Sequence, residues 1–186
     1  MRKVIFFMLT TVNGFYERAP WVIDWHHAGD PEFNDFALAQ LDAADLMVFG
    51  RRTYEGMAAY WPTEDAITSD PDVARRMNSM AKLVFSRSLG DATWQNTRLV
   101  RGDAAEEVAR LKAASGRDII VMGSGDLATS LAERRVIDEL RILVNPIALP
   151  EGKPVFAGLK ADLPLRLLSA RTFASGNVLL TYAPRV

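Results

Sequence analysis

The sequence contains no cysteine, and its two histidines, His26 and His27, are neighbours. Without cysteine the chain can form neither a disulfide nor a thiolate zinc site. This fits a reducing compartment, and we expect the protein in the cytoplasm. Adjacent side chains point apart, and there is no third histidine to complete a metal site. We therefore expect no bound metal.

A strong excess of charge of one sign is also missing, because the formal net charge is −1. The chain therefore has no general attraction to nucleic acid or to an anionic membrane, and any anion must be bound by locally placed groups. No apolar run approaches the length that crosses a bilayer. The run at residues 4–9 follows a basic start but is too short for a signal peptide and lacks a cleavage site. A buried first strand explains it better.

Segments with strand character alternate with segments with helix character through most of the 186 residues. The predicted strands cover residues 4–11, 46–49, 82–86, 98–100 and 118–122. The predicted helices cover residues 32–43, 53–60, 72–79, 104–114 and 127–134. This alternation is typical of a three-layer α/β/α protein with a mostly parallel sheet. No linker or repeat divides the chain, and we expect one domain over residues 1–186.

The pattern changes near the C-terminus. A long strand at residues 137–147 precedes a stretch interrupted by prolines, and two further strands at 165–172 and 177–182 flank the turn ASG. These last two strands predict an antiparallel hairpin at one edge of the sheet. An edge strand of this kind can pair with a twin subunit.

Two turns place a glycine where an apolar strand gives way to a helix. They are GRRT at residues 50–53 and GSGD at residues 123–126. A helix start leaves backbone N–H groups unpaired and carries partial positive charge, and glycine lets a phosphate approach the backbone. Thr53 can cap the helix and touch phosphate, while Arg51 and Arg52 can bind phosphate in a bidentate manner.

A third turn, Ser86-Arg87, follows another predicted strand and supplies the same chemistry. Because the carboxyl ends of parallel strands meet at one edge, we expect the three turns to converge on one crevice. The additional arginine indicates a dinucleotide that carries an extra phosphate. Each turn alone also has a simpler interpretation, since residues 123–128 can form a plain tight turn and the arginines can simply be exposed.

Several motifs follow one another in a recognisable order. They are TTVNG at residues 10–14, FGRRTYE at 49–55, LVFSR at 83–87, VMGSG at 121–125, and IDELR at 137–141 followed by GKPVF at 152–156. In sequence and order they resemble the dihydrofolate reductase-like superfamily. Within it, the chain is most similar to the branch related to the reductase domain of bacterial bifunctional riboflavin-biosynthesis enzymes. The resemblance spans nearly the whole chain.

The resemblance implies a dihydrofolate reductase-like mixed sheet, NADPH as hydride donor, a small pyrimidine- or pteridine-type substrate, and a homodimer. The implied activity is similar to 5-amino-6-(5-phosphoribosylamino)uracil reductase or dihydrofolate reductase. The implied cofactor residues are Gly50, Arg51, Arg52 and Thr53 at a phosphate, Ser86 and Arg87 at the adenosine 2′-phosphate, and Gly123, Ser124, Gly125 and Asp126 at the pyrophosphate and nicotinamide.

The chain departs from the family pattern at two positions. Relatives commonly carry an acidic residue where Asn13 stands, and dihydrofolate reductases have a second glycine where Ser124 stands. Since a non-proline cis peptide is easiest beside glycine, Ser124 argues against a cis bond in this turn. For the substrate we predict contacts from Asn13, Trp25 and Phe36, although aromatic side chains more often simply fill cores.

Hydride delivery to a C=N bond leaves charge on nitrogen, so a proton must come from a carboxyl group or from water held by one. Acidic candidates near the first predicted helix are Asp24, Asp30, Glu32 and Asp35. Glu32 stands one helical turn before Phe36, which would place its carboxyl beside an aromatic ring, where burial raises a pKa. We predict Glu32 as the catalytic acid, while acids in a first turn also simply favour the helix dipole.

Three functions stay open. The first is an NADPH-dependent reductase acting on a C=N or C=O bond of a small heterocycle. The second is an NADP(H)-binding module or sensor without turnover. It is favoured because Asn13 replaces an acidic residue of the relatives and because no acidic residue stands out as the proton donor. The third is flavin binding by the aromatic side chains.

Overall fold

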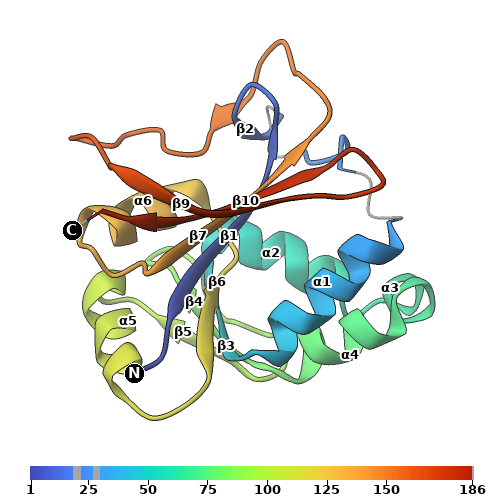
Figure 1. The fold of residues 1–186 in the computed structure, drawn as a ribbon. Coiled ribbons are helices and arrows are strands. Elements are labelled where there is room, and N and C mark those ends of the chain that lie inside the picture. The colour runs from blue at the N-terminus through green and yellow to red at the C-terminus, as the bar shows by residue number, and fades with distance from the viewer. Residues whose placement is uncertain (19–21, 27–29, 186) are drawn as a thin grey trace.

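The computed structural model describes residues 1–18, 22–26 and 30–185 and contains a large and a small sheet (Figure 1). The strands of the large sheet are β1 (Val4–Thr11), β3 (Ala44–Gly50), β4 (Ala81–Phe85), β5 (Thr97–Val100), β6 (Asp118–Val121), β7 (Glu139–Asn145), β9 (Leu165–Thr172) and β10 (Val178–Pro184). Their order in space is β5-β4-β3-β6-β1-β7-β10-β9. Neighbours from β5 to β7 run parallel, whereas β10 runs antiparallel to both β7 and β9. The mostly parallel sheet with an antiparallel C-terminal hairpin is confirmed.

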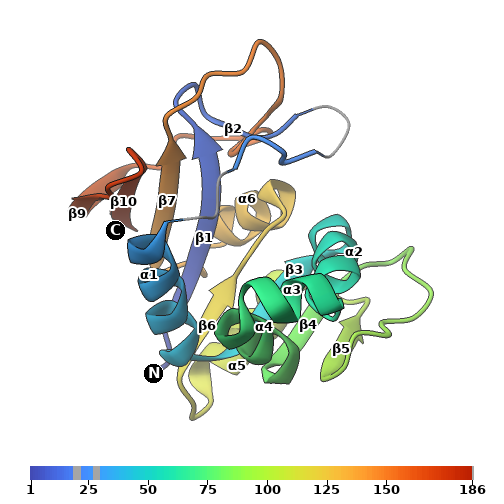
Figure 2. The same cartoon turned by 90° about the vertical axis from the view of Figure 1, so that its right-hand side faces the viewer.

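Helices cover both faces of this sheet (Figure 2). They are α1 (Pro31–Asp42), α2 (Arg51–Tyr60), α3 (Glu64–Ser69), α4 (Pro71–Ser79), α5 (Ala104–Ala113) and α6 (Gly125–Glu133). On one face α1, α2 and α4 share an apolar cluster with Phe7 and Met47 of the sheet. On the other face α5 and α6 share a cluster with Phe6 and Val48. The predicted three-layer α/β/α architecture is therefore confirmed.

The burial of individual strands follows from their place in the sheet. In β1, which is flanked by β6 and β7 and covered on both faces, seven of eight residues are buried. A continuous apolar run suits this position. None of the eight residues of the edge strand β9 is buried, and Leu167 is 52% exposed. Within the described ranges, no helix is long and apolar enough to span a bilayer.

The small sheet and α3 are absent from the predicted elements. The small sheet pairs β2 (Phe15–Glu17) with β8 (Lys153–Pro154). Strands this short carry no alternating pattern, and they pair only because the fold brings residues 17 and 153 together. Both views place β2 and the segment before β8 above the carboxyl ends of β1 and β7 (Figures 1 and 2).

The turn between β6 and α6 corrects one expectation. The peptide bond between Gly123 and Ser124 is cis, so the inference that Ser124 argues against a cis bond is wrong. Gly123 alone supplies the glycine beside this bond, and its φ of 115° is one that side chains rarely adopt.

Lys82 is a buried cation at the start of β4, only 1% exposed. Its ammonium group donates hydrogen bonds to the carbonyl oxygens of Asn78, Met80 and Gln95 at 3.1, 2.7 and 3.1 Å. It also lies 4.4 Å from the centre of the Trp94 ring. Burial lowers the pKa of Lys82 to about 8. The carbonyl groups and the indole thus take the place of water around the charge.

We predict a pH dependence of stability from Lys82. Between pH 8 and the ordinary lysine value of 10.5 the unfolded chain binds a proton that the folded chain lacks. The free energy of unfolding should therefore rise with pH in this window, by up to about 1.4 kcal/mol per pH unit, and Lys82 adds no slope below it. Chemical denaturation of the wild type and Lys82→Met measures the difference. The exposed control Lys160→Met should keep the wild-type slope, and a wild-type slope in Lys82→Met would contradict the assignment.

Candidate functional site

The turns after β4, β3 and β6 lie side by side at one edge of the large sheet. Gly50 at the end of β3 stands opposite Phe85 at the end of β4, and Val48 stands opposite Val121 at the end of β6. Ser86 and Met122 therefore leave the sheet on either side of Gly50. The three turns singled out in the sequence share one rim.

The turns after β3 and β6, which start α2 and α6, touch through their glycines. The N–H of Gly50 donates to the carbonyl oxygen of Gly123 at 2.8 Å. A Cβ on Gly50 would lie 2.9 Å from Oγ and 3.2 Å from N of Ser124, and a Cβ on Gly123 would lie 2.9 Å from Oγ1 of Thr53. The starts of α2 and α6 approach this closely because the glycines carry no side chains.

Both helices at this rim begin without a side-chain cap. Asp30, Thr63 and Asp103 each accept a hydrogen bond from the first turn of α1, α3 or α5, whereas α2 and α6, like α4, have no such bond. The expectation that Thr53 caps its helix is therefore not met. The helix starts keep the N–H groups and partial positive charge that attract an anion.

Charged side chains surround the start of α2. Arg51 forms an ion pair with Glu55 at 3.5 Å, one turn along the helix. Arg52 is exposed and lies close enough to Glu17 of β2 to act on its charge. Burial raises the pKa of Glu17, against the opposing effects of Lys153 and Arg52. Glu17 of the small sheet thus places a carboxylate close to Arg52, one of the residues predicted to bind phosphate.

The start of α6 is covered by the small sheet. A Cβ on Gly125 would lie 2.8 Å from the ring of Tyr16, which is 6% exposed. Lys153 Nζ lies 2.7 Å from Oδ2 of Asp126 and 5.8 Å from the centre of the Tyr16 ring. Burial lowers the pKa of Lys153, but hydrogen bonds to Asp126 and Tyr16 outweigh this and raise it. The sequence contains Lys153 within the motif GKPVF, but the spacing of this motif does not reveal that Lys153 contacts the start of α6.

The turn after β4 is held by its own serine. Ser86 Oγ accepts hydrogen bonds from the N–H groups of Ser88 and Leu89 at 3.2 and 2.9 Å. Its oxygen is therefore engaged within the turn, while its O–H remains a donor. The side chain of Arg87 is exposed.

The predicted acid lies at the surface beside the C-terminal hairpin. Glu32 is exposed, and its Oε2 accepts a hydrogen bond from the N–H of Ala174 at 3.3 Å. Its neighbour Asp30 is 6% exposed and accepts from the N–H groups of Glu32 and Ser175. The hydrogen bonds from Ser175 lower the pKa of Asp30 in spite of burial. The buried setting expected for the Glu32 carboxyl is therefore not met.

Phe36 lies among three other phenylalanines. Its ring centre is 5.8 Å from that of Phe7, 6.3 Å from Phe33 and 6.2 Å from Phe173. It is half-buried against the apolar cluster, and Met122 at the end of β6 packs against the same cluster. Phe36 therefore carries both a core contact and a partly open face.

Asn13 and Trp25, also predicted at the substrate, differ in their hydrogen bonding. The Asn13 amide donates to the carbonyl of Leu149 at 2.8 Å and accepts from the Leu149 N–H at 3.2 Å, which ties two loops together. Trp25 is 3% exposed, and its Nε1 has no hydrogen-bond partner in the described part of the chain. A buried unpaired donor of this kind is rare.

His26, which the sequence argues against as a metal ligand, contacts the last residue of β7. Its Nδ1 lies 3.1 Å from Oδ1 of Asn145. The amide nitrogen of Asn145 donates to the carbonyl oxygens of Thr10 and Leu143, so Oδ1 must accept. His26 therefore carries a proton on Nδ1. His27 lies outside the described residues.

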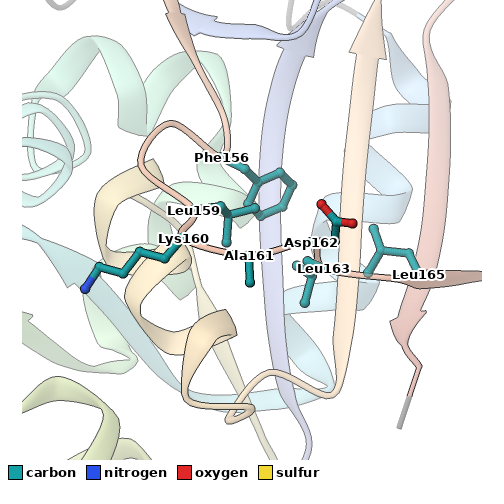
Figure 3. Close-up of a pocket in the computed structure, with 7 residues that line it drawn as sticks. All are labelled: Phe156, Leu159, Lys160, Ala161, Asp162, Leu163 and Leu165. Atoms are coloured by element: carbon teal, nitrogen blue, oxygen red, sulfur yellow. The ribbon is translucent and has the colours of Figure 1, made fainter.

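A separate hollow of about 500 Å³ lies between β8 and β9 (Figure 3). It is lined by Phe156, Leu159, Lys160, Ala161, Asp162, Leu163 and Leu165, of which Lys160 points away from the others. The N–H of Lys160 donates to Glu133, the last residue of α6, so the hollow lies at the far end of the helix from the rim. No three potential metal ligands gather in the portion of the chain that is described.

Comparison with known proteins gives a consistent result. The family model of the RibD C-terminal domain matches residues 2–179. The uncharacterized protein YyaP of Bacillus subtilis is 31% identical over 183 residues, which are 97% of this chain and 94% of YyaP.

Solved structures share the fold at low sequence identity. A pyrimidine reductase-like protein from Corynebacterium diphtheriae superimposes with a TM-score of 0.68 at 15% identity, covering 100% of this chain and 92% of that one. Dihydrofolate reductase from Enterococcus faecalis, complexed with NADP(H), gives 0.66 at 14% identity and covers 99% and 97%. The dihydrofolate reductase-like fold is thereby shown.

The contact between Gly125 and Tyr16 gives a test of the rim. We expect Gly125→Ala to lower the free energy of unfolding by about 1–3 kcal/mol, because the new methyl group overlaps a buried ring. Gly56→Ala is the matched control, since no atom lies within 4 Å of its added Cβ. Alanine should there stabilise α2 by up to about 1 kcal/mol. An equal gain in both variants, measured by denaturant titration, would show that Tyr16 does not hold this position.

Proposed function

The chain belongs to the family of RibD C-terminal domains, and from this premise we propose that it is a single-domain, NADPH-dependent reductase. Its substrate would be a small pyrimidine- or pteridine-type heterocycle that is reduced at a C=N or C=O bond. The observation that carries the proposal is the rim, where two uncapped helix starts and the Ser86-Arg87 turn lie side by side.

The residues at the rim fit a dinucleotide phosphate. Side chains on Gly50 or Gly123 would fill the space between the two turns, so glycine keeps the backbone accessible. We assign Gly50, Arg51, Arg52 and Thr53 to a phosphate of NADPH. The further assignments are Ser86 and Arg87 to the 2′-phosphate, and Gly123, Ser124, Gly125 and Asp126 to the pyrophosphate and nicotinamide.

The substrate is assigned to the side of the sheet covered by α1. Trp25 supports this, because its buried Nε1 finds no acceptor among the described residues, and a substrate carbonyl or ring nitrogen would provide one. Phe36 supplies a partly open aromatic face. Asn13 holds the neighbouring loop, and we keep it as a substrate contact only through its second amide hydrogen.

The chemistry is divided between cofactor and protein. NADPH, when bound, supplies the hydride. The chain fixes the dinucleotide at the rim and orients the heterocycle, which together replace a bimolecular encounter by a fixed geometry. The proton is assigned to Glu32, directly or through water, and this assignment remains a prediction.

A homodimer is part of the proposal. The open edge of β9 carries Leu167 and Leu168, which are 52% and 44% exposed, and its outer bonding groups can pair with a second chain. Light scattering that gives the mass of a single chain would contradict this.

The activity assay separates the reductase from the sensor. Purified protein is incubated with NADPH and a panel of oxidised pyrimidines and pteridines, and the loss of NADPH is followed. Consumption that depends on one heterocycle supports the reductase. Tight NADPH binding without consumption across the panel favours the sensor, and absence of NADPH binding excludes both.

Arg87 provides a prediction for cofactor choice. Arg87→Ala should weaken NADPH binding on the order of tenfold, because a charge-assisted bond to the 2′-phosphate is lost. NADH lacks this phosphate, and its affinity should change by less than about twofold. Calorimetric titration of both dinucleotides measures the ratio. Equal losses would remove Arg87 from the 2′-phosphate site.

Glu32 can be tested without disturbing the hairpin. Glu32→Gln keeps an oxygen that accepts from the Ala174 N–H but cannot donate a carboxyl proton. If Glu32 is the acid, turnover should fall on the order of a hundredfold in Glu32→Gln and in Glu32→Ala alike, with little change in NADPH affinity. A wild-type turnover in Glu32→Gln and a loss only in Glu32→Ala would leave Glu32 with the hairpin contact alone.

A further inference from the structure

The segment between β4 and β5 is irregular backbone whose conformation depends on side chains. Its first residue, Ser86, accepts hydrogen bonds from the N–H groups of Ser88 and Leu89. The amides of the turn are thereby held without a partner strand. The carbonyl groups of the same turn need a separate donor.

That donor is Arg101, the first residue after β5. Its guanidinium group donates to the carbonyl oxygens of Arg87, Leu89 and Gly90 at 3.0, 2.9 and 3.0 Å. A guanidinium group is planar, and its donors keep a fixed angle to one another. Three bonds to one such group therefore set the orientation of the peptide units between residues 87 and 90.

Arg87 and Arg101 differ in what they can offer a ligand. A guanidinium group has five N–H donors, and Arg101 uses three of them on carbonyl groups of the turn. Arg87 contributes its carbonyl to this network, and its side chain is exposed. A long side chain loses rotamer freedom when it is ordered, and a fixed backbone limits the further cost.

We propose that Arg101 is a positioning residue that fixes the backbone of Arg87 and thereby sets the preference of the site for NADPH over NADH. Arg101 acts through Arg87 and does not itself touch the phosphate. This inference rests on the proposed function, because it assumes that Arg87 meets the 2′-phosphate.

A double-mutant cycle tests the proposal. NADPH and NADH are titrated calorimetrically into the wild type, Arg87→Ala, Arg101→Ala and the double variant. Arg101→Ala should weaken NADPH on the order of tenfold and NADH by less than about twofold. The double variant should bind NADPH as weakly as Arg87→Ala alone, because both changes remove the same contact. Additive losses would mean that Arg101 binds the phosphate directly and would overturn the proposal.

Two further variants separate geometry from charge. Arg101→Lys keeps the positive charge but not the planar fork, so it should lose most of the NADPH preference. Wild-type preference in this variant would overturn the positioning role. Arg98→Ala removes the exposed arginine of β5, whose ion pair is with Glu107 of α5, and it should leave the preference unchanged.

Hydrogen exchange gives a readout that needs no nucleotide. In Arg101→Ala the amides of Ser88 and Leu89, which donate to Ser86 Oγ in the wild type, should exchange at least about tenfold faster, while those of β4 stay protected. Unchanged exchange would overturn the inference. If the wild type fails to bind NADPH, the proposed function fails instead, and the exchange result still reports on the role of Arg101 in the turn.

Discussion

The close approach of Gly50 to the Gly123–Ser124 peptide is the constraint on which the rim depends. The hydrogen bond of 2.8 Å between Gly50 and Gly123, and the absence of Cβ atoms on both, allow α2 and α6 to begin side by side at the ends of β3 and β6. Both helices then begin without side-chain caps, and their N–H groups gather at one edge of the sheet. A side chain at Gly50 would meet Ser124 and press these helix starts apart. The gathering of the two helix starts at this edge is therefore a result of packing.

Around this fixed centre, the rim consists largely of irregular backbone held by polar side chains. Asn13 joins the turn after β1 to the loop at Leu149, and Arg101 holds the turn after β4. Lys153 of the small sheet reaches Asp126 at the start of α6. In these segments polar side chains add hydrogen bonds to those between backbone groups, such as the bond from the Val12 N–H to the carbonyl oxygen of Ile147.

Much of the fold follows from the sequence, and less of the site does. The apolar run of β1 and the alternation of strands and helices predict the three layers, and the glycine turns predict the rim. The spacing of Glu32 and Phe36 along one helix predicts a buried carboxyl beside an aromatic ring, but the side chain of Glu32 is exposed. Glu32 instead meets Ala174, 142 residues away, in a hairpin whose position no local pattern reveals.

The sequence by itself determined the order of most helices and strands and the turns between them, because these depend on residues within a few positions of one another. Tertiary structure alone decided which polar groups face each other. The bond between His26 and Asn145 joins residues 119 positions apart, and the bond between Asn13 and Leu149 joins residues 136 apart. Such contacts form only after helices and sheet have packed, since a hydrogen bond is too short-ranged and its net free energy too small to bring distant segments together.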